Sequence, residues 1–549
     1  MSGGLRRSPL LAVALVATCG CTPWREYVYN GFKVGPNYRK PAAPVAADWI
    51  DAGDVRISEE PPNLQRWWTV FNDPALDALI NNAVNQNLTL REAGFRVMRA
   101  RAVRAATIGE IFPQTQDVAG GYSRNAMSTQ AANTGFLQDR FFDEWDGGFN
   151  LGWELDFWGR YRRAIEAADA DLDASIESYD AILVTLLADV AQAYVEVRTL
   201  QTQIQLVRAN ETLQAETLKI VSAKFSGGMV SELDVDQAKS NLAQTQALVP
   251  KFQIPLRQAE LRLCILMGIP PTDLDRMIGA GDIPTASTAV AVGIPANLLA
   301  QRPDVRRAER DVAAQSARVG VAVSELYPHI GITGAIGVSA QNASNLFTSE
   351  ALQGSVGPSF QWNVLNYGRL LNAIRIQDAR LAELIAFYQN KVLEANAEVE
   401  SGLVEFLRSQ EQATFLDASV SASVRATNVA LTQYEFGMID FNRVSLIEQN
   451  LVSQQDLYAQ AEGDIALGLI EIYRALGGGW QIRLEESQGP EALPPVNETG
   501  DGLVPDAPAR PENLPLPAPA PGPVVPTPPA ADSRSQPSLV QPAALEVGA

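Results

Sequence analysis

The chain has 549 residues, a formal net charge of −20 at pH 7 and only 19% charged residues. Such an acidic chain has no electrostatic attraction for nucleic acid, so no nucleic-acid partner is expected. It contains one histidine and three cysteines, and we find no clustered acid, base or nucleophile of the kind that catalysis needs. We therefore expect no enzyme, no cofactor and no metal site. The histidine, His329, follows Pro328 at the start of a predicted strand and is interpreted as structural.

The N-terminal residues have the organisation of an export signal. Two arginines precede an apolar run at residues 10–17, which is too short to be a membrane anchor but typical of a signal peptide. The run ends in Cys19-Gly20-Cys21, which resembles a bacterial lipoprotein cleavage box with a small residue before the acyl-accepting cysteine. The sequence therefore predicts a signal peptide over residues 1–20 and a lipid, such as palmitate, on Cys21. Cys19 is the alternative lipidation site.

Two segments lack any helical or strand period. Residues 21–62 carry recurring Pro, Gly and Trp and are predicted to form a lipidated, extended leader over the surface. Residues 481–549 are rich in Pro and Ala and are predicted to form a disordered or polyproline-like tail. The remaining cysteine, Cys264, would then have no partner in the chain, so no disulfide is expected.

The most regular pattern is an alternation of apolar and polar residues from Glu144 to Arg160, EWDGGFNLGWELDFWGR. This period is typical of a β-strand with one apolar and one polar face. The segment is long enough to cross a bilayer as a tilted strand, which takes about 9–11 residues. The residues predicted to face lipid are Trp145, Phe149, Leu151 and Trp153. For a single such segment, the alternative is a half-buried strand in a soluble sandwich.

A second alternating segment, Ser355 to Arg369, ends in the same aromatic-Gly-Arg sequence and is predicted to turn Phe360 and Trp362 toward lipid. Weaker strands are predicted at residues 114–122 and 330–338. The recurrence favours a membrane sheet of four strands over the soluble alternative.

Helical periodicity dominates the rest of the first half. One helix is predicted after Asp73-Pro74, where the proline follows an aspartate cap, and another at residues 88–110. A third begins at Arg160 and ends near Lys224; at 1.5 Å per residue its roughly 65 residues would extend about 100 Å. The return helix, residues 231–267, is shorter. Stacked end to end, the return helix and the 88–110 helix would match the long helix.

The second half repeats the first. Four pairs of landmarks are related by the same shift of 209 in residue number: Trp153 and Trp362, Tyr179 and Tyr388, Gly228 and Gly437, and Gly268 and Gly477. The chain is therefore predicted to be a tandem duplication, with repeats at residues 63–268 and 295–480 and a connector at 269–294. The helices expected in the second repeat cover residues 306–325, 370–436 and 441–476.

Four strands cannot close a membrane sheet alone. Every backbone group in hydrocarbon must be paired, so the sheet edges must be closed by other copies of the chain. Rotational symmetry would give eight strands in a dimer or twelve in a trimer. The long hairpins would continue the resulting barrel as a hollow cylinder.

Several motifs resemble those of the TolC-like outer-membrane efflux protein family, in its OprM/NodT-type lipoprotein branch. They are Val34-Gly35-Pro36-Asn37-Tyr38, WWTVFNDPALDALI at residues 67–80, the helix around Ala93 to Arg101, Arg302-Pro303-Asp304-Val305-Arg306 with Ala308-Glu309, and Tyr327-Pro328. The resemblance implies a mainly α-helical fold with transmembrane β-strands, closing as a trimeric α-barrel and β-barrel tube of twelve strands and twelve helices.

The resemblance also implies the function. The expected protein is the exit duct of a tripartite efflux system, lipid-anchored in the outer membrane and extending into the periplasm. It would passively conduct drugs or other small molecules delivered by a periplasmic adaptor and an inner-membrane pump, commonly of the resistance-nodulation-division class. The alternatives are a trimeric structural stalk without transport and the exit duct of a type I protein secretion system.

The two hairpin turns are the predicted periplasmic tip, FSGGMVSELDV from Phe225 and YEFGMIDFNRV from Tyr434. By family resemblance, the residues expected to contact the adaptor are Gly228, Met229, Val230, Gly437, Met438 and Ile439. Asp440 and Arg443 are the candidate gate, because acidic side chains repeated around a symmetry axis would favour cations. The alternative is that the glycines only form turns and that Asp440 only caps a helix.

Overall fold

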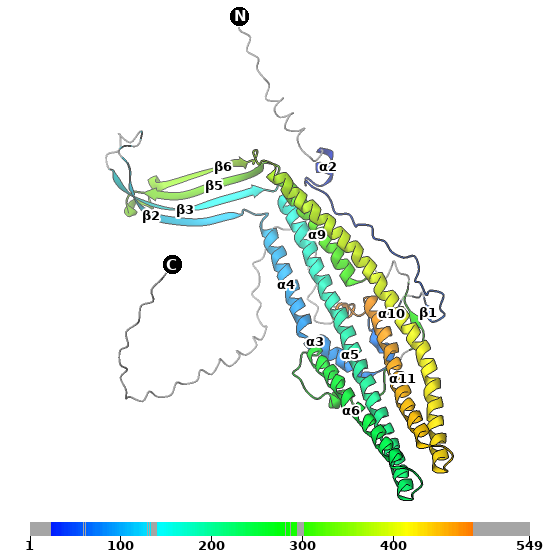
Figure 1. Ribbon diagram of the computed structural model, residues 1–549. Coiled ribbons are helices and arrows are strands. Elements are labelled where there is room, and N and C mark those ends of the chain that lie inside the picture. The colour runs from blue at the N-terminus through cyan, green and yellow to red at the C-terminus, as the bar shows by residue number, and fades with distance from the viewer. Residues whose placement is uncertain are drawn as a thin grey trace, which may run out of the picture. The chain divides into compact units, whose positions relative to one another are not determined.

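The computed structural model describes residues 24–486 except 59, 61, 129, 131, 133–139, 280, 286 and 294–300. It is mainly helical and contains a four-stranded antiparallel sheet, as predicted (Figure 1). The predicted signal peptide, both candidate lipidation cysteines and the tail from residue 487 lie outside the described residues. Within the described part of the chain, no helix combines the length and the apolar character needed to cross a membrane. Cys264, also in this part, is a free, buried cysteine.

The two repeats contain the same series of elements. The first has α3 (Pro74–Gln86), α4 (Leu88–Gly109), β2 (Thr115–Ala126), β3 (Phe141–Leu155), α5 (Arg160–Ser226) and α6 (Glu232–Leu266). The second has α9 (Pro303–Ser324), β5 (His329–Ala340), β6 (Leu352–Gln361), α10 (Arg369–Glu435) and α11 (Phe441–Ala475). Shorter elements are α2 (Trp24–Tyr29), β1 (Ile57–Ser58), η1 (Trp67–Phe71), α7 (Asp275–Ile278), β4 (Val290–Ala291), η2 (Ala343–Asn345), η3 (Ser349–Ala351) and α12 (Ile482–Glu486).

The repeats correspond with more than one shift in residue number. Helices α5 and α10 both have 67 residues, α6 and α11 both have 35, and both pairs begin at the predicted shift of 209. By contrast, α4 and α9, like β2 and β5, are related by a slightly larger shift. The shift of 209 drawn from the four landmark pairs therefore holds from the second strand of each repeat onward, where all four pairs lie. The longer segment between the two strands of the first repeat, residues 127–140 against 341–351, accounts for part of this difference.

Both alternating segments end as strands earlier than predicted. β3 ends at Leu155 because the Asp156 carboxylate accepts a hydrogen bond from the backbone N–H of Tyr161 (3.0 Å) and so turns the chain into α5. β6 ends at Gln361, which leaves Trp362 just beyond the strand. The sequence pattern continued through these turns because the residues that form them keep the same alternation of polarity.

Each long helix lies beside two short helices stacked end to end, as predicted (Figure 1). In the first repeat, Asn87 caps α4 by accepting from the N–H of Leu90 (2.8 Å), and its Nδ2 donates to the carbonyl of Leu266 at the end of α6 (2.8 Å). In the second repeat, Arg302 Nη1 donates to the carbonyl of Ala475 at the end of α11 (2.7 Å). Unpaired groups at the helix ends are thus satisfied by the neighbouring short helix.

The largest apolar core lies where the short helices meet. Trp67 of η1 is 1% exposed and stacks on Tyr473 with 5.3 Å between ring centroids. Asp73 caps α3 by accepting from backbone N–H groups and also accepts a hydrogen bond from the Tyr194 hydroxyl (2.5 Å). The double-tryptophan and Asn-Asp-Pro motifs of the sequence therefore build the centre of the helical part. Phe406 of α10 is fully buried in the same cluster.

The leader contacts helices of both repeats. The Tyr27 hydroxyl donates to the carbonyl of Phe157 (2.6 Å), and the Arg163 guanidinium donates to the carbonyls of Val34 (3.1 Å) and Gly35 (3.0 Å). Further along, β1 pairs in parallel with β4. The described part of the leader contains the six-residue helix α2, which the sequence pattern did not indicate.

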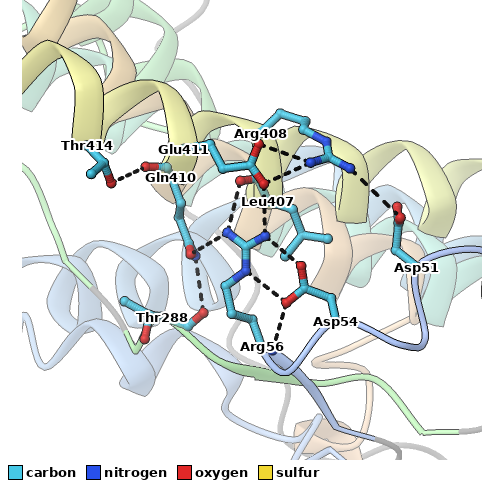
Figure 2. Close-up of polar contacts among 9 residues, drawn as sticks. All are labelled: Asp51, Asp54, Arg56, Thr288, Leu407, Arg408, Gln410, Glu411 and Thr414. Atoms are coloured by element: carbon cyan, nitrogen blue, oxygen red, sulfur yellow. Dashed lines mark hydrogen bonds and ion pairs between the residues drawn. The ribbon is translucent and has the colours of Figure 1, made fainter.

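The leader is held at its far end by Arg56 (Figure 2). Its guanidinium donates to Asp54 (2.6 Å), to the carbonyl of Leu407 on α10 (3.2 Å) and to Glu411 (3.2 Å). The hydrogen bonds that the side chain and the backbone N–H of Arg56 donate to Asp54 lower the pKa of the Asp54 carboxyl to about 2. Asp51 adds a longer ion pair to Arg408 (3.9 Å). Charged residues of the leader are thus paired with charged residues of α10.

The described structure continues beyond the predicted start of the tail. Arg483 of α12 forms two hydrogen bonds to the fully buried Asp180 carboxylate (2.7 and 2.8 Å). The Arg306 guanidinium lies 4.9 Å from the ring centroid of Trp480. The boundary predicted at residue 481 is therefore too early, because these contacts fix the segment to α5 and α9.

Candidate functional site

The sheet, in the order β2-β3-β5-β6, has one apolar and one polar face. Residues directly opposite in an antiparallel pair share a face, and Phe149 lies between Val118 and Ile336. The residues that this register places on the apolar face are Val118, Tyr122, Trp145, Phe149, Leu151, Trp153, Ile330, Ile332, Ile336, Val356 and Phe360. On the other face, Asn150 donates to Asp117 (3.0 Å). The predicted lipid-facing residues of both segments therefore lie together, apart from Trp362.

The tryptophans at the inner end of the sheet are anchored by their indole N–H groups. Trp153 donates to the carbonyl of Ile111 (2.9 Å) and Trp362 to the carbonyl of Leu326 (3.0 Å). Trp362 thus lies outside β6 but makes the contact equivalent to that of Trp153. Amphipathic rings held in this way are typical of the interface between a membrane and water.

The sheet has two open edges within one chain. β2 pairs only with β3, and β6 only with β5, among the described strands. Val118 on β2 and Val356 on β6 are among the exposed apolar residues. Open edges with unpaired backbone groups need a partner strand in hydrocarbon.

His329 belongs to a charged cluster at the foot of the sheet. Its Nδ1 lies 2.7 Å from a Glu154 oxygen, and its Nε2 lies 3.5 Å from Glu325. Arg160 forms ion pairs with the same two carboxylates (3.2 and 3.3 Å). The cluster joins the end of β3, the start of β5 and the start of α5, in agreement with the structural role predicted for the histidine.

The two hairpin turns share a small apolar core. Gly228 and Gly437, with φ angles of 72° and 74°, take the left-handed conformation that favours glycine. Met229 and Met438 are 69% and 64% exposed. The predicted contact residues Val230 and Ile439, by contrast, pack partly buried against that core, so they stabilise the turns. Its buried members are Val221, Val235, Ala238, Ala430, Tyr434, Phe441 and Val444.

Asp440 and Arg443, the candidate gate pair, meet through the backbone. The Asp440 carboxylate accepts a hydrogen bond from the backbone N–H of Arg443 (3.0 Å) and caps α11. The equivalent turn of the first repeat uses Ser231 and Asp234 as a capping box. Asp440 therefore has a structural role, and its role as a gate stays a prediction.

A polar seam between the hairpins was not predicted. Gln203, Asn210 and Thr217 of α5 lie at seven-residue intervals, which places them on one side of the helix. They bond across to α11, to Asp456 (2.7 Å), Gln455 (2.6 Å) and Glu448 (2.7 Å) respectively. The heptad spacing of polar residues in an otherwise apolar stripe was the signal available in the sequence.

Glu448 is the most deeply buried acid of this seam, at 2% exposure. Burial raises the pKa of its carboxyl, and the hydrogen bond from Thr217 opposes part of that rise. Nearer the turns, Asn241 of α6 donates to the Ser445 hydroxyl of α11 (2.5 Å). Polar side chains thus line much of the contact between the two hairpins in the half that ends at the glycine turns, here called the distal half.

The sheet and the paired long hairpins define an outer-membrane channel protein. The model of the outer membrane efflux protein family matches residues 79–269 and 294–478, and the chain belongs to this family. It is therefore an outer-membrane efflux channel and not an enzyme. These matched segments cover most of the two repeats.

The chain is similar to several named proteins and solved structures. It is 28% identical over 465 residues to nodulation protein T of Rhizobium leguminosarum bv. trifolii, covering 84% of this chain and 97% of that protein. It is 29% identical to the toluene efflux pump outer membrane protein TtgI of Pseudomonas putida, covering 82% and 96%. The solved outer-membrane channel OprN is 32% identical with a TM-score of 0.76, covering 82% of this chain and 99% of that one.

Proposed function

We propose that three copies of the chain form a closed duct that serves as the outer-membrane exit of a tripartite efflux system. The observation that carries this proposal is the four-stranded sheet with one apolar face and two open edges. Three such sheets would give twelve strands, a size at which a barrel encloses a water-filled interior. The polar face with Asn150 and Asp117 would line that interior.

The test is conductance of the purified full-length protein in planar lipid bilayers, with its native mass measured in parallel. Discrete conductance steps from a particle with the mass of three chains are expected. A trimer without conductance would favour the structural stalk, and a stable monomer or dimer would contradict the trimeric duct.

Partner recognition is proposed for the hairpin tips. Met229 and Met438 present flexible apolar side chains at the turns, and such side chains are common at adaptable binding surfaces. The partners would be a periplasmic adaptor and an inner-membrane pump of the resistance-nodulation-division class, carrying small molecules. In support, relatives are named for efflux of toluene and export of pyoverdine. Met438→Ser should weaken co-purification with such an adaptor without changing the native mass.

A lipid on Cys21 would anchor the start of the leader in the outer membrane, after removal of residues 1–20. The leader contacts both repeats, so an anchor at its start would hold the duct to the inner leaflet. Mass spectrometry of the N-terminal peptide tests this. An unmodified Cys21, or cleavage at another position, would contradict the anchor and leave the duct proposal standing.

A further inference from the structure

We infer that a cavity in the helical part binds organic ammonium ions, that is, small molecules that carry a protonated amine on an apolar body. The cavity has a volume of about 690 Å³ and lies between α5, α6 and α11. Its size is typical of small-molecule sites, which occupy about 300–1,000 Å³. The inference rests on the proposed function, because it names a class of molecule that the duct would hold on its inner wall.

The cavity lies on the side of α5 that faces away from the largest apolar core. On the core side, the Tyr194 hydroxyl donates to Asp73 (2.5 Å) and the Arg198 guanidinium donates to the carbonyl of Ile278 (2.9 Å). Glu196, which lines the cavity, follows Tyr194 by two residues and is therefore about 200° further around the helix. The leader packs on the core side, where β1 pairs with β4. Because a lipid-anchored leader must reach the membrane outside the duct, the cavity would open toward the bore.

Apolar side chains from three helices line the cavity. They are Leu200 of α5, Phe252 and Pro255 of α6, and Leu467 of α11. Helix α11 comes close to α5 here because Gly463 has no side chain: a Cβ at this position would lie 2.4 Å from the Thr199 hydroxyl oxygen. This approach places the next residue, Asp464, in the wall of the cavity. The apolar lining offers area that the body of a ligand can cover and remove from water.

Carboxylates without a cationic partner lie in the same wall. Glu405 of α10 and Asp464 of α11 both line the cavity. Among the described residues, neither carboxylate forms an ion pair or a hydrogen bond. Burial raises the pKa of both carboxyls, and the nearby charges of Asp464 and Glu471 raise the pKa of Glu405 further. A cation placed beside these carboxylates would therefore stabilise their charged forms.

The two basic residues of the cavity do not compensate these acids. Arg262 pairs with Asp189 instead (3.6 Å), and the Lys251 ammonium lies 5.6 Å from the centroid of the Phe252 ring. Within the described part of the chain, neither basic residue forms an ion pair with an acid of the opposite wall. The uncompensated charge of the cavity is therefore negative, which favours a cation over an anion of the same size.

A backbone acceptor makes the cavity suited to an amine that carries N–H groups. Pro255 lies inside α6 and has no backbone N–H. The carbonyl oxygen of Lys251, four residues earlier, therefore receives no helical hydrogen bond. Both residues line the cavity. A protonated amine would donate to this oxygen, whereas a quaternary ammonium has no N–H with which to do so.

The test is a fluorescence titration of the purified full-length protein in detergent with two dansyl dyes of opposite charge. Dansylcadaverine carries a primary ammonium, whereas dansylglycine carries a carboxylate on the same fluorophore. After subtraction of the signal from empty micelles, the protein should bind dansylcadaverine at least tenfold more tightly than dansylglycine. Glu405→Gln combined with Asp464→Asn should weaken dansylcadaverine binding at least fivefold and leave dansylglycine binding no weaker.

The matched control is Asp48→Asn combined with Glu60→Gln, which removes the same two charges from exposed positions in the leader. This control should bind both dyes as the wild type does. Equal affinity of the wild type for the two dyes, or unchanged dansylcadaverine affinity without Glu405 and Asp464, would overturn the cavity as a cation site. If removing these two charges alters the native mass, Phe252→Ala takes their place; it should weaken dansylcadaverine binding at least threefold, and unchanged binding would overturn the site.

Conductance and native mass of the wild type separate the inference from the function on which it rests. A conducting trimer that binds the two dyes equally would overturn the cation site and leave the proposed duct intact. A protein that forms no conducting trimer would contradict the proposed function itself. Selective binding of dansylcadaverine by that protein would still support the cation site, because every residue that lines the cavity belongs to one chain.

Discussion

The sheet and the distal half of the hairpins place their polar side chains in opposite ways. In the sheet, apolar side chains such as Phe149 lie on one face, and polar ones such as Asn150 occupy the other face. Between the distal hairpins, Thr217 and Glu448 are buried together, whereas the apolar Met438 is exposed at the turn. The sheet therefore leaves an apolar face uncovered within one chain, whereas the contact between the two hairpins buries polar side chains.

Apolar and polar contacts also contribute differently to the stability of the protein. The stabilisation from burying apolar area does not depend on direction and grows with the area removed from water. A buried polar pair, by contrast, must first lose its hydration. The polar seam between α5 and α11 therefore holds the hairpins in register more than it holds them together. The fully buried Phe406 and Trp67 provide the apolar contact nearer the middle of the helices.

The largest effect is expected from a charge on the apolar face of the sheet. Leu151→Arg should impair membrane insertion by about 2–4 kcal/mol, because a guanidinium near the middle of the bilayer is costly. The neighbouring Asn150→Arg, on the polar face, should insert and mainly alter conductance. The yield of protein in the outer membrane measures insertion, and single-channel recordings measure conductance. Equal behaviour of the variants would show that the two faces are assigned wrongly.

A smaller loss is expected when the polar seam is broken on one side only. Thr217→Val removes the hydroxyl that donates to Glu448 (2.7 Å), and a buried carboxylate without its partner should cost about 1–3 kcal/mol in unfolding free energy. Thr212→Val is the matched control, since Thr212 is less buried on the same helix. Denaturant unfolding in detergent should give a lower midpoint for Thr217→Val than for Thr212→Val. Equal midpoints would contradict a stabilising role for the polar seam.

The same carboxyl makes stability depend on pH. The pKa of Glu448 is raised by burial, so its neutral form is favoured in the folded protein, and stability should fall as the pH rises through that pKa. Glu448→Gln should therefore be more stable than the wild type at pH 7 and equal to it at pH 4. Glu435→Gln, which removes the same charge from an exposed position, is the control. Thermal unfolding midpoints of the variant and the wild type at the two pH values test this prediction. A difference in midpoint that persists at pH 4 would point to another cause.

The smallest stability effect and the sharpest functional one are expected at the turn. Asp440→Asn keeps a good helix cap, so the unfolding free energy should change by less than about 0.5 kcal/mol. If the carboxylates gather at a constriction, the variant should reduce cation preference in bilayer recordings. Ser231→Ala, at the equivalent turn, should cost about 1 kcal/mol without a change in selectivity. Unchanged selectivity in Asp440→Asn would leave Asp440 as a helix cap alone.

Much of the fold could be predicted from the sequence because its signals are local and repeated. The alternation around Phe149, the glycine turns at Gly228 and Gly437 and the long runs without proline each specify one element. The duplication then doubled the evidence for each. The ends of the strands were wrong by several residues, because the side chain of Asp156 turns the chain while the polarity pattern continues.

The candidate site was only partly predictable. Exposure of Met438 follows from its place at a turn, but the partial burial of Ile439 depends on the small core that the two turns share. The pairing of Thr217 with Glu448 joins residues 231 positions apart, and no local pattern indicates which polar side chains will meet. Long-range pairs of this kind depend on the packing angle between α5 and α11.

The leader has a consequence for the order of folding. Tyr27 to Arg56 precede both repeats in the chain, yet Arg56 bonds to Leu407, 351 residues later in the chain. The leader therefore has no complete binding surface until both repeats have formed. Contacts of such long sequence separation form slowly, so docking of the leader would be among the last steps and would close the finished protomer. A chain truncated within the second repeat would leave this segment free and open to proteolysis.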